Sequence, residues 1–222
     1  MTTVGVKTSL EPGKPSMHSM FVSRGRRCRS FSSVPSYKTF DEIKQRLKEG
    51  NNRYVADVED LKSNADLRAS LKGGQSPFAI VLSCADSRVV PEMIFDCNIG
   101  ELFVVRVAGN IANSSSIASI EYAVSNLGCK YILVLGHEAC GAVNAAIAGG
   151  DNGKHLNHLC SHIEEAVHTS SSKETTDVVK LNATINANGL LKNSPIISDL
   201  VENKQVEIGA GFYAFDGTVE FL

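Results

Sequence analysis

The chain has 222 residues, of which 43% are hydrophobic and 21% are charged, a balance typical of a soluble globular protein with one sizeable core. The net charge of −2 gives no electrostatic footprint for nucleic acid, and no apolar run reaches the roughly 18–20 residues that span a bilayer. Six cysteines are too few and too scattered for a disulfide framework, so reduced thiols are expected.

The beginning of the chain differs in composition from the rest. Residues 1–40 hold seven Lys and Arg side chains against one acidic residue, whereas the remainder has a net charge of −8. The stretch MFVSRGRRCRSFSSVPSY, from Met20, is rich in Arg and Ser and lacks acidic residues, which is the composition of an organelle transit peptide. Residues 1–38 are therefore predicted to be a basic leader for import, and their Arg density favours the mitochondrion. A plastid leader, a cytoplasmic protein and a disordered basic tail are the alternatives.

Two helices are expected after the leader. The first is expected to begin near Asp41. Four apolar side chains are spaced to share one face of this helix: Phe40, Ile43, Leu47 and Tyr54. A second, short helix is expected over 57–71.

Three continuous apolar runs then predict buried parallel strands over 77–86, 101–109 and 130–137. The segment NSSSIASIEYAVSNLG predicts a helix between the second and third strands, capped by Asn113 or Ser114 and ended by Gly128. The Ala-rich segment CGAVNAAIAGG predicts another helix after the third strand.

The last third of the chain predicts further helices and a hairpin. Residues 151–180 indicate a helix with a loose loop at TSSSKETT, and helices are expected over 181–193 and 195–203. QVEIGAGFYAF and GTVEFL indicate two strands joined by a turn at Asp216-Gly217. Strands that alternate with helices predict an α/β fold with a mostly parallel central sheet flanked by helices, in one domain over 39–222.

Metal-ligating residues follow two of the predicted strands. Cys84 ends the first strand, and His137 and Cys140 follow the third. If the second strand lies on the far side of the first, these ends meet where the strand order reverses, which is where open parallel sheets form sites. Two thiolates and one imidazole with one open position are a ligand set of catalytic zinc, whereas structural zinc takes a fourth protein ligand.

Asp86 and Arg88 follow Cys84 at alternate positions. Asp86 is close enough in sequence to reach the metal, and Arg88 can hold its carboxylate away in a bidentate ion pair. Held in this way, Asp86 can accept a hydrogen bond from zinc-bound hydroxide and orient it. Released, it could coordinate zinc and close the site. The alternative is a surface ion pair of little energetic consequence.

Other histidines and cysteines are available as ligands. The segment HLNHLCSH, residues 155–162, places His158 and His162 on one helical face, which raises a second metal site as an alternative. No carboxylate pair backs it, so an exposed polar helix is favoured. Cys97 and Cys129 lie in apolar stretches and are predicted to be small core residues.

The motif CADSR (84–88), followed about fifty residues later by HEACG (137–141), resembles the β-class carbonic anhydrases. The similarity continues through LKEGNNRYV, ELFVVRVAGN, SIEYAV and IGAGFYAFDGTVEFL, and covers nearly all of 39–222. Each motif alone is weak, but together and in this order they are specific. The resemblance implies four parallel strands plus a C-terminal strand, and assembly as a homodimer or a higher homo-oligomer.

The resemblance also implies roles for individual residues. One Zn²⁺ per subunit would be held by Cys84, His137 and Cys140, with Asp86 and Arg88 at the open position. Substrate would be bound by Gln75, by Phe103 and Tyr122 from a neighbouring subunit, and by the Gly141 amide at a helix start.

The implied activity is that of a carbonate dehydratase, a lyase that hydrates CO₂ reversibly to bicarbonate and a proton by attack of zinc-bound hydroxide. Two thiolates neutralise Zn²⁺, so the pKa of its water should exceed the value of about 7 in a three-histidine site, and activity should rise in alkaline solution. Val81 stands where some members have a tryptophan beside an inhibitory bicarbonate, so Arg106 lacks that partner and the open form is predicted.

Two other functions stay open at this point. A related zinc hydrolase of carbonyl sulfide or carbon disulfide would use the same scaffold, and a non-catalytic protein would use zinc only for structure. A redox protein is disfavoured because no C-x-x-C pair accompanies Cys84 and Cys140.

Overall fold

A computed structural model describes residues 37–222, so residues 1–36 of the predicted leader, with Cys28, lie outside the described residues. Its centre is a five-stranded sheet of β1 (Ala79–Ser83), β2 (Leu102–Arg106), β3 (Tyr131–His137), β4 (Glu207–Tyr213) and β5 (Val219–Phe221). The strand order is β2-β1-β3-β4-β5, with the first four parallel and β5 antiparallel to β4. This confirms the mostly parallel α/β fold and the terminal hairpin. It also confirms that the second strand lies on the far side of the first.

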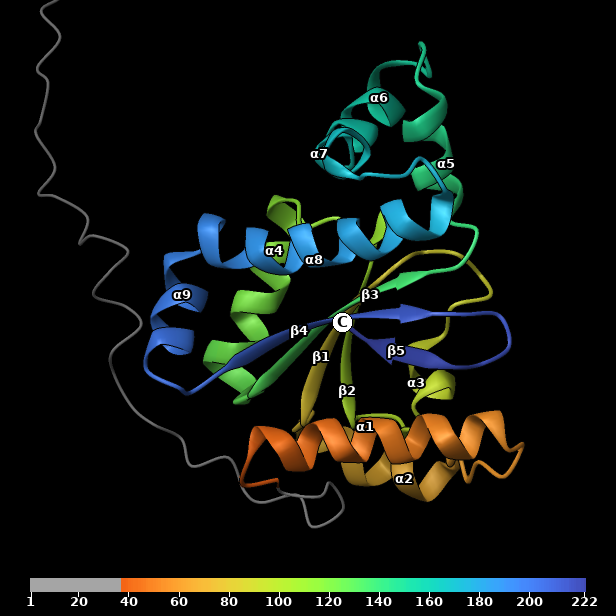
Figure 1. Ribbon diagram of the computed structural model, residues 1–222. Coiled ribbons are helices and arrows are strands. Elements are labelled where there is room, and N and C mark those ends of the chain that lie inside the picture. The colour runs from red at the N-terminus through yellow and green to blue at the C-terminus, as the bar shows by residue number, and fades with distance from the viewer. Residues whose placement is uncertain (1–36) are drawn as a thin grey trace, which may run out of the picture. The chain divides into compact units, whose positions relative to one another are not determined.

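One face of the sheet packs against α1 (Phe40–Val55) and α3 (Pro91–Ile94). The helix α1 begins at a capping box in which Thr39 and Glu42 bind each other's backbone amides. Its Ile43 and Leu47 are buried with Val81 of β1, which gives the sheet the apolar cover expected of a parallel sheet. Figure 1 shows α1 and α8 on opposite sides of the sheet.

The prediction of a helix over 57–71 is wrong for the first half of that range. The structure has α2 only over Ala65–Ser70, followed by a 3₁₀ turn over Leu71–Gly73. The preceding segment is not helical, and there the backbone amides of Asp60 and Lys62 donate to the side chains of Asp96 and Asn98, at 3.0 and 2.6 Å. These partners are distant in sequence, so local periodicity could not reveal them.

The other face packs against α4 (Ser114–Tyr122), a π-helical turn (Ala123–Leu127), α8 (Thr175–Asn193) and α9 (Pro195–Glu202). Asn113 caps α4 as expected, and Gly128 closes the π turn with a φ of 72°. The helix α8 begins at Thr175 rather than near residue 181. Its added first turns bury Val178 and Val179, so tertiary packing extends the helix into a Ser/Thr-rich sequence.

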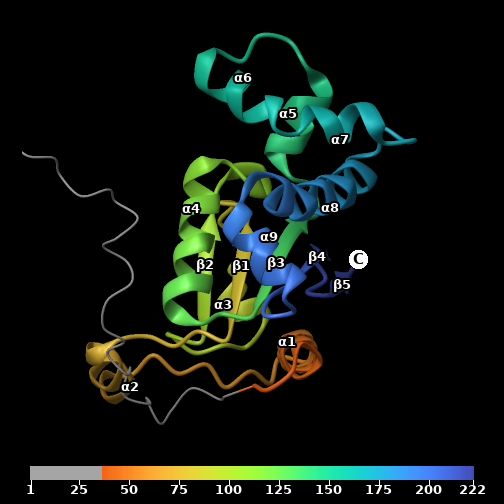
Figure 2. The ribbon, with the colours of Figure 1, turned by 90° about the vertical axis from the view of Figure 1, so that its left-hand side faces the viewer.

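Three short helices extend beyond α8: α5 (Gly141–Ala148), α6 (Lys154–Ser161) and α7 (Glu164–Thr169) (Figure 2). Of these, α5 confirms the helix predicted from CGAVNAAIAGG, whereas α6, α7 and the first turn of α8 replace the single helix and loop predicted for residues 151–180. A third cluster of buried residues, including Cys84, Cys140 and Ile163, packs where they meet the carboxyl ends of the strands. Across residues 37–222, no helix combines the length and the apolar character that crossing a membrane requires.

Candidate metal centre

The carboxyl ends of β1 and β3 bring three potential metal ligands together. Cys84 follows β1, His137 ends β3, and Cys140 lies directly before α5. Their ligand atoms lie within 4.8 Å of one another, and it is the one such group of three or more found in residues 37–222. Cys84 is 5% exposed, and the other two are fully buried. The strand order thus produces the predicted convergence.

The surroundings of His137 leave one ring nitrogen ready to bind a cation. Its Nδ1 lies 2.8 Å from the backbone oxygen of Glu138, and a carbonyl can only accept, so Nδ1 carries the proton. The other nitrogen, Nε2, is buried and has no hydrogen-bond partner. A buried acceptor without a partner is costly, and a metal ion beside it would remove that cost. The donor set fits Zn²⁺, which binds thiolate and imidazole together.

The two cysteines interact directly. The hydrogen bond from Cys140 is the main cause that holds the pKa of Cys84 well below its ordinary value, although burial opposes this. The neighbouring Cys84 sulfur and burial raise the pKa of Cys140, while the amides of Ala142 and Val143 at the start of α5 act in the opposite direction. Without a cation the two sulfurs therefore share one proton. A bound cation favours loss of that proton as well.

Asp86 and Arg88 form a bidentate pair. Oδ1 of Asp86 accepts from the backbone N and from Nε of Arg88, both at 2.9 Å, and Oδ2 accepts from Nη2 at 2.7 Å. The Arg88 guanidinium holds the pKa of Asp86 well below its usual range. Side-chain exposure is 18% for Asp86 and 55% for Arg88, so the carboxylate is largely shielded while the guanidinium reaches solvent.

Two residues around this pair have contacts that sequence reasoning missed. Arg106 donates from Nε to the Cys84 oxygen at 3.0 Å and from Nη2 to the Asp86 oxygen at 2.5 Å, which fixes the backbone of the CADSR loop. The ring of Phe215 lies 4.3 Å from Cζ of Arg88 and 6.1 Å from the ring of His137. Only the strand order reveals Phe215, because it follows Tyr213, which pairs with His137 across β3 and β4.

The predicted substrate residues lie in different parts of the fold. Gly141 is exposed and is the first residue of α5, next to Cys140. Phe103 lies in β2 and Tyr122 at the end of α4, with ring centres 6.4 Å apart and Tyr122 52% exposed. Gln75 is exposed and precedes β1, whereas Cys84 follows it, so one chain does not bring Gln75 to the metal ligands.

The remaining histidines and cysteines form no comparable group. The rings of His158 and His162 lie 5.2 Å apart and nearly perpendicular, and in the described chain they belong to no cluster of three potential ligands. Cys97 and Cys129 are buried, and burial raises the pKa of each to about 12. Both are core residues, as predicted.

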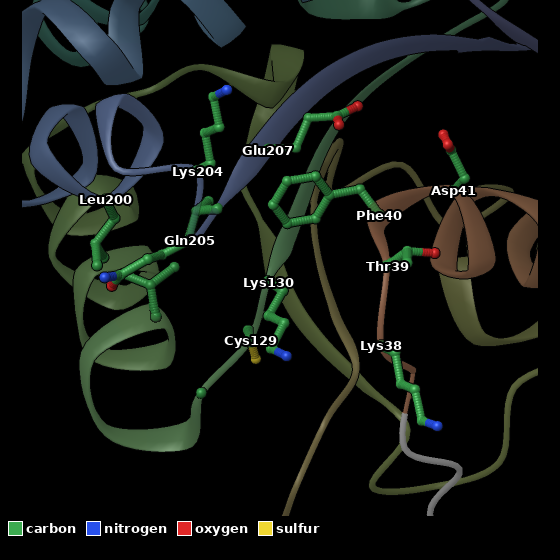
Figure 3. Close-up of a pocket in the computed structure, with 13 residues that line it drawn as sticks. Lys38, Thr39, Phe40, Asp41, Cys129, Lys130, Leu200, Lys204, Gln205 and Glu207 are labelled. Carbon is green, nitrogen blue, oxygen red and sulfur yellow. The ribbon is translucent and has the colours of Figure 1, made fainter.

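A cavity of about 680 Å³ lies at the opposite, amino end of β3 and β4 (Figure 3). Phe40 reaches into it from α1, Leu200 lines it from α9, and Lys130 and Glu207 mark the strand starts. None of the predicted site residues lines this cavity. It is therefore separate from the candidate metal centre.

Comparison with known proteins gives close matches in sequence. A family model described as carbonic anhydrase matches residues 79–219. Carbonic anhydrase 2 of two Mycobacterium tuberculosis strains, CDC 1551 and H37Rv, is 52% identical over 108 residues, which are 48% of this chain and 52% of each relative. The match thus spans about half the length of those relatives. The carbonic anhydrase of Mycolicibacterium smegmatis is 36% identical over 184 residues, 78% of this chain and 89% of that protein.

Solved structures resemble the fold. One of the tetrameric β-carbonic anhydrases from Sordaria macrospora has a TM-score of 0.65 and 25% identity, over 82% of this chain and 97% of that one. The β-carbonic anhydrase of Coccomyxa, solved in complex with acetazolamide, has a TM-score of 0.64 and 25% identity, over 84% and 87%. The residues that the family model matches include all three candidate ligands and the Asp86–Arg88 pair.

Proposed function

Because the chain belongs to the β-carbonic anhydrase family, we propose that it hydrates CO₂ reversibly to bicarbonate and a proton, at a zinc ion held by Cys84, His137 and Cys140. The observation that carries this proposal is the buried, unpartnered Nε2 of His137 beside two buried cysteine sulfurs. Three protein ligands leave one tetrahedral position for substrate chemistry, as catalytic zinc sites require.

Two of the three ligands are oriented by a neighbouring backbone group. The Glu138 carbonyl sets the tautomer of His137, and the Gly109 amide donates to Sγ of Cys84 at 3.4 Å. When bound, zinc would lower the pKa of a water molecule and so supply the nucleophile. The protein's own part is to hold the three ligand atoms in place and to keep the fourth position open.

The Asp86–Arg88 pair supports this open arrangement. Arg88 turns both carboxylate oxygens of Asp86 toward itself, so the carboxylate does not occupy the fourth position. The lowered pKa keeps Asp86 ionised at neutral pH, where it can accept a hydrogen bond from the attacking water and orient it. Arg106 keeps the loop backbone from shifting.

A second copy of the chain would complete the substrate pocket. The strand β2 is an outer strand of the sheet, and Tyr122 is an exposed aromatic residue beside it. An exposed aromatic residue next to a sheet edge suits contact with another subunit, which would bring Phe103, Tyr122 and Gln75 to the partner's metal. The Sordaria macrospora relatives are tetrameric, which supports a homo-oligomer here. The exposed Gly141 amide would face a developing anion.

The activity can be tested by stopped-flow CO₂ hydration with the zinc-loaded full-length chain, across about pH 6.5 to 9. We expect a rate that rises with pH, its loss in Cys84→Ser, and an unchanged rate in Cys160→Ser, which alters a buried cysteine outside the ligand group. Absence of activity at every pH with one zinc bound per chain would contradict the proposal. Turnover of carbonyl sulfide by that protein would then identify the alternative hydrolase, and no turnover would indicate a structural zinc.

Import into mitochondria is a separate proposal, based on the Arg- and Ser-rich composition of residues 1–38. A fluorescent protein fused after residue 38 should enter mitochondria, and a fusion with the four arginines of Arg24 to Arg29 replaced by glutamine should not. Cytosolic fluorescence from the unaltered fusion would contradict import, and plastid fluorescence would change the organelle.

A further inference from the structure

The helix α8 places two amide side chains where it packs on the rest of the molecule. Asn182 is fully buried and Asn186 is 6% exposed, and they lie one turn apart beside the apolar Ala183 and Ala187. Buried amides are retained where they make hydrogen bonds, so their partners show what they hold.

Both asparagines bind the turn that follows β2. Nδ2 of Asn182 donates to the Gly109 oxygen at 2.9 Å, and Oδ1 of Asn186 accepts from the Ala112 amide at 2.7 Å. Nδ2 of Asn186 also donates to Oδ1 and to the backbone oxygen of Asn182, both at 2.9 Å. The two amides therefore act as one hydrogen-bonded unit that holds residues 109–112 at both ends.

The same turn contacts the candidate metal centre. The Gly109 amide is the group that donates to Sγ of Cys84 at 3.4 Å. Gly109 has a φ of 71°, and a Cβ there would lie 2.8 Å from Cδ1 of Ile163 and 3.3 Å from Cβ of Ala142. The turn is thus pressed against α5 and the residue before α7. A shift of the turn would move the amide away from the sulfur.

We propose that Asn182 and Asn186 are positioning residues of the metal centre, which hold the Gly109 amide against the sulfur of Cys84. A hydrogen bond to a ligating sulfur fixes its orientation and its share of negative charge, and such outer contacts influence metal retention. This inference rests on the proposed zinc centre. It assigns to the α8 amides a role that apolar side chains of similar size could not perform.

The test is the rate at which zinc passes from the loaded full-length protein to a chromophoric chelator. Asn182→Leu and Asn186→Leu should release zinc about ten- to hundredfold faster than wild type, and the double variant little faster than either. The Co²⁺-loaded variants should also show a shifted sulfur-to-metal absorption band. Asn182→Asp preserves the shape of the side chain but removes the donor to Gly109, and it decides the question if the leucine variants do not fold.

Two variants in the same helix separate positioning from general stability. Leu190→Ala opens a space in the core next to α9 and should lower the melting temperature without faster zinc release at a temperature where it is folded. Asn188→Leu changes an exposed asparagine and should match wild type in both measurements. Release from the Asn182 and Asn186 variants at the wild-type rate, or no faster than from Leu190→Ala, would overturn the inference and leave the proposed function standing. A wild-type chain that binds no zinc would overturn both.

Discussion

Two groups of histidine and cysteine residues in this molecule have similar composition and different geometry. Cys84, His137 and Cys140 come from two neighbouring strands and a helix start, are buried, and have ligand atoms within 4.8 Å of one another. Residues 155–162 come from one helix and its C-cap, and within them the His158 and His162 rings pack edge to face. A metal site of this kind therefore depends on a topology that brings segments distant in sequence together.

Neighbouring hydrogen bonds extend this contrast. At the carboxyl ends of β1 and β3, the Glu138 carbonyl sets the tautomer of His137, and Arg106 holds the backbone of the loop around Cys84 and Asp86. Along α6, Asn157 and Ser161 bind nearby residues of their own segment and leave the histidine rings without such support. Preorganised ligands bind metal without first paying the cost of ordering.

The largest expected effect comes from breaking the convergent group. Cys84→Ser or His137→Ala should leave little zinc bound and should lower CO₂ hydration at least about a thousandfold, because two remaining ligands do not retain the ion. Zinc content per chain and stopped-flow rates measure this. The matched control is the double variant His158→Ala with His162→Ala, for which wild-type zinc content and rate are expected. Loss of zinc in that control would show that His158 and His162 help to hold the ion, which would contradict the comparison.

The next effect concerns the ion pair at the end of β1. Arg88→Ala should keep one zinc per chain but lower kcat/KM about ten- to hundredfold, because Asp86 is no longer held away from the open position. Lys62→Ala removes an exposed ion pair, with Asp60 at 2.8 Å, and should leave kcat/KM unchanged. Equal effects of the two substitutions would show that the pair at the strand end is ordinary surface charge.

The same variant has a signed pH dependence. Arg88 lowers the pKa of Asp86, so the stabilisation from this carboxylate is present above its unfolded pKa and is lost as the pH falls through its lower, folded pKa. In Arg88→Ala the folded pKa of Asp86 should rise toward its unfolded value, so the carboxylate should add less stability at neutral pH, and the gap in stability between wild type and variant should narrow as the pH falls below the usual Asp pKa of about 3.9. Thermal unfolding measured as the pH is lowered from neutral checks this, and parallel curves would contradict it.

A smaller effect is expected from the aromatic contact on Arg88. Phe215→Leu should lower kcat/KM only about two- to fivefold, because a partly exposed cation–π contact is weak. Phe221→Leu removes a similar contact, in which Nζ of Lys48 lies 5.3 Å from the ring centre, at the sheet edge formed by β5. It should leave kcat/KM unchanged. A larger loss from Phe221→Leu than from Phe215→Leu would refute the role given to Phe215.

The smallest effect is confined to α6. Burial, and then the neighbouring His158, lower the pKa of His162, so His158→Ala should raise that pKa slightly and leave it below its usual value. Because the folded pKa is depressed, protonation favours the unfolded chain, and stability falls as the pH drops through the usual histidine pKa of about 6.5. An NMR titration of His162 measures the shift. A fall in its pKa in the variant would be the wrong sign.

The sequence predicted the first three strands well because each lies in a continuous apolar run, and their order placed Cys84 beside His137. It failed where distant partners decide the local structure. Asp96 and Asn98 bind backbone amides of the non-helical segment before α2, and burial of Val178 and Val179 lengthens α8. In each case the deciding contact comes from a segment that local patterns do not connect.

The candidate site shows the same division. Its three ligands and the Asp86–Arg88 pair lie in two short motifs, which a reader of the sequence can find. Phe215 is recognisable only once β4 is known to lie beside β3, and Asn182 only once α8 is known to pack on the turn after β2. The leader, the substrate-binding role of Gln75 and the contribution of Phe103 and Tyr122 to a neighbouring subunit stay predictions.

The central claim is that Cys84, His137 and Cys140 hold one catalytic zinc ion. X-ray absorption at the zinc edge of the loaded protein tests it most directly. We expect two sulfur ligands at about 2.3 Å, one imidazole nitrogen at about 2.0–2.1 Å and one further light atom in the fourth position. A coordination shell of imidazoles without sulfur, or of four protein ligands that include a third sulfur or a second imidazole, would contradict it.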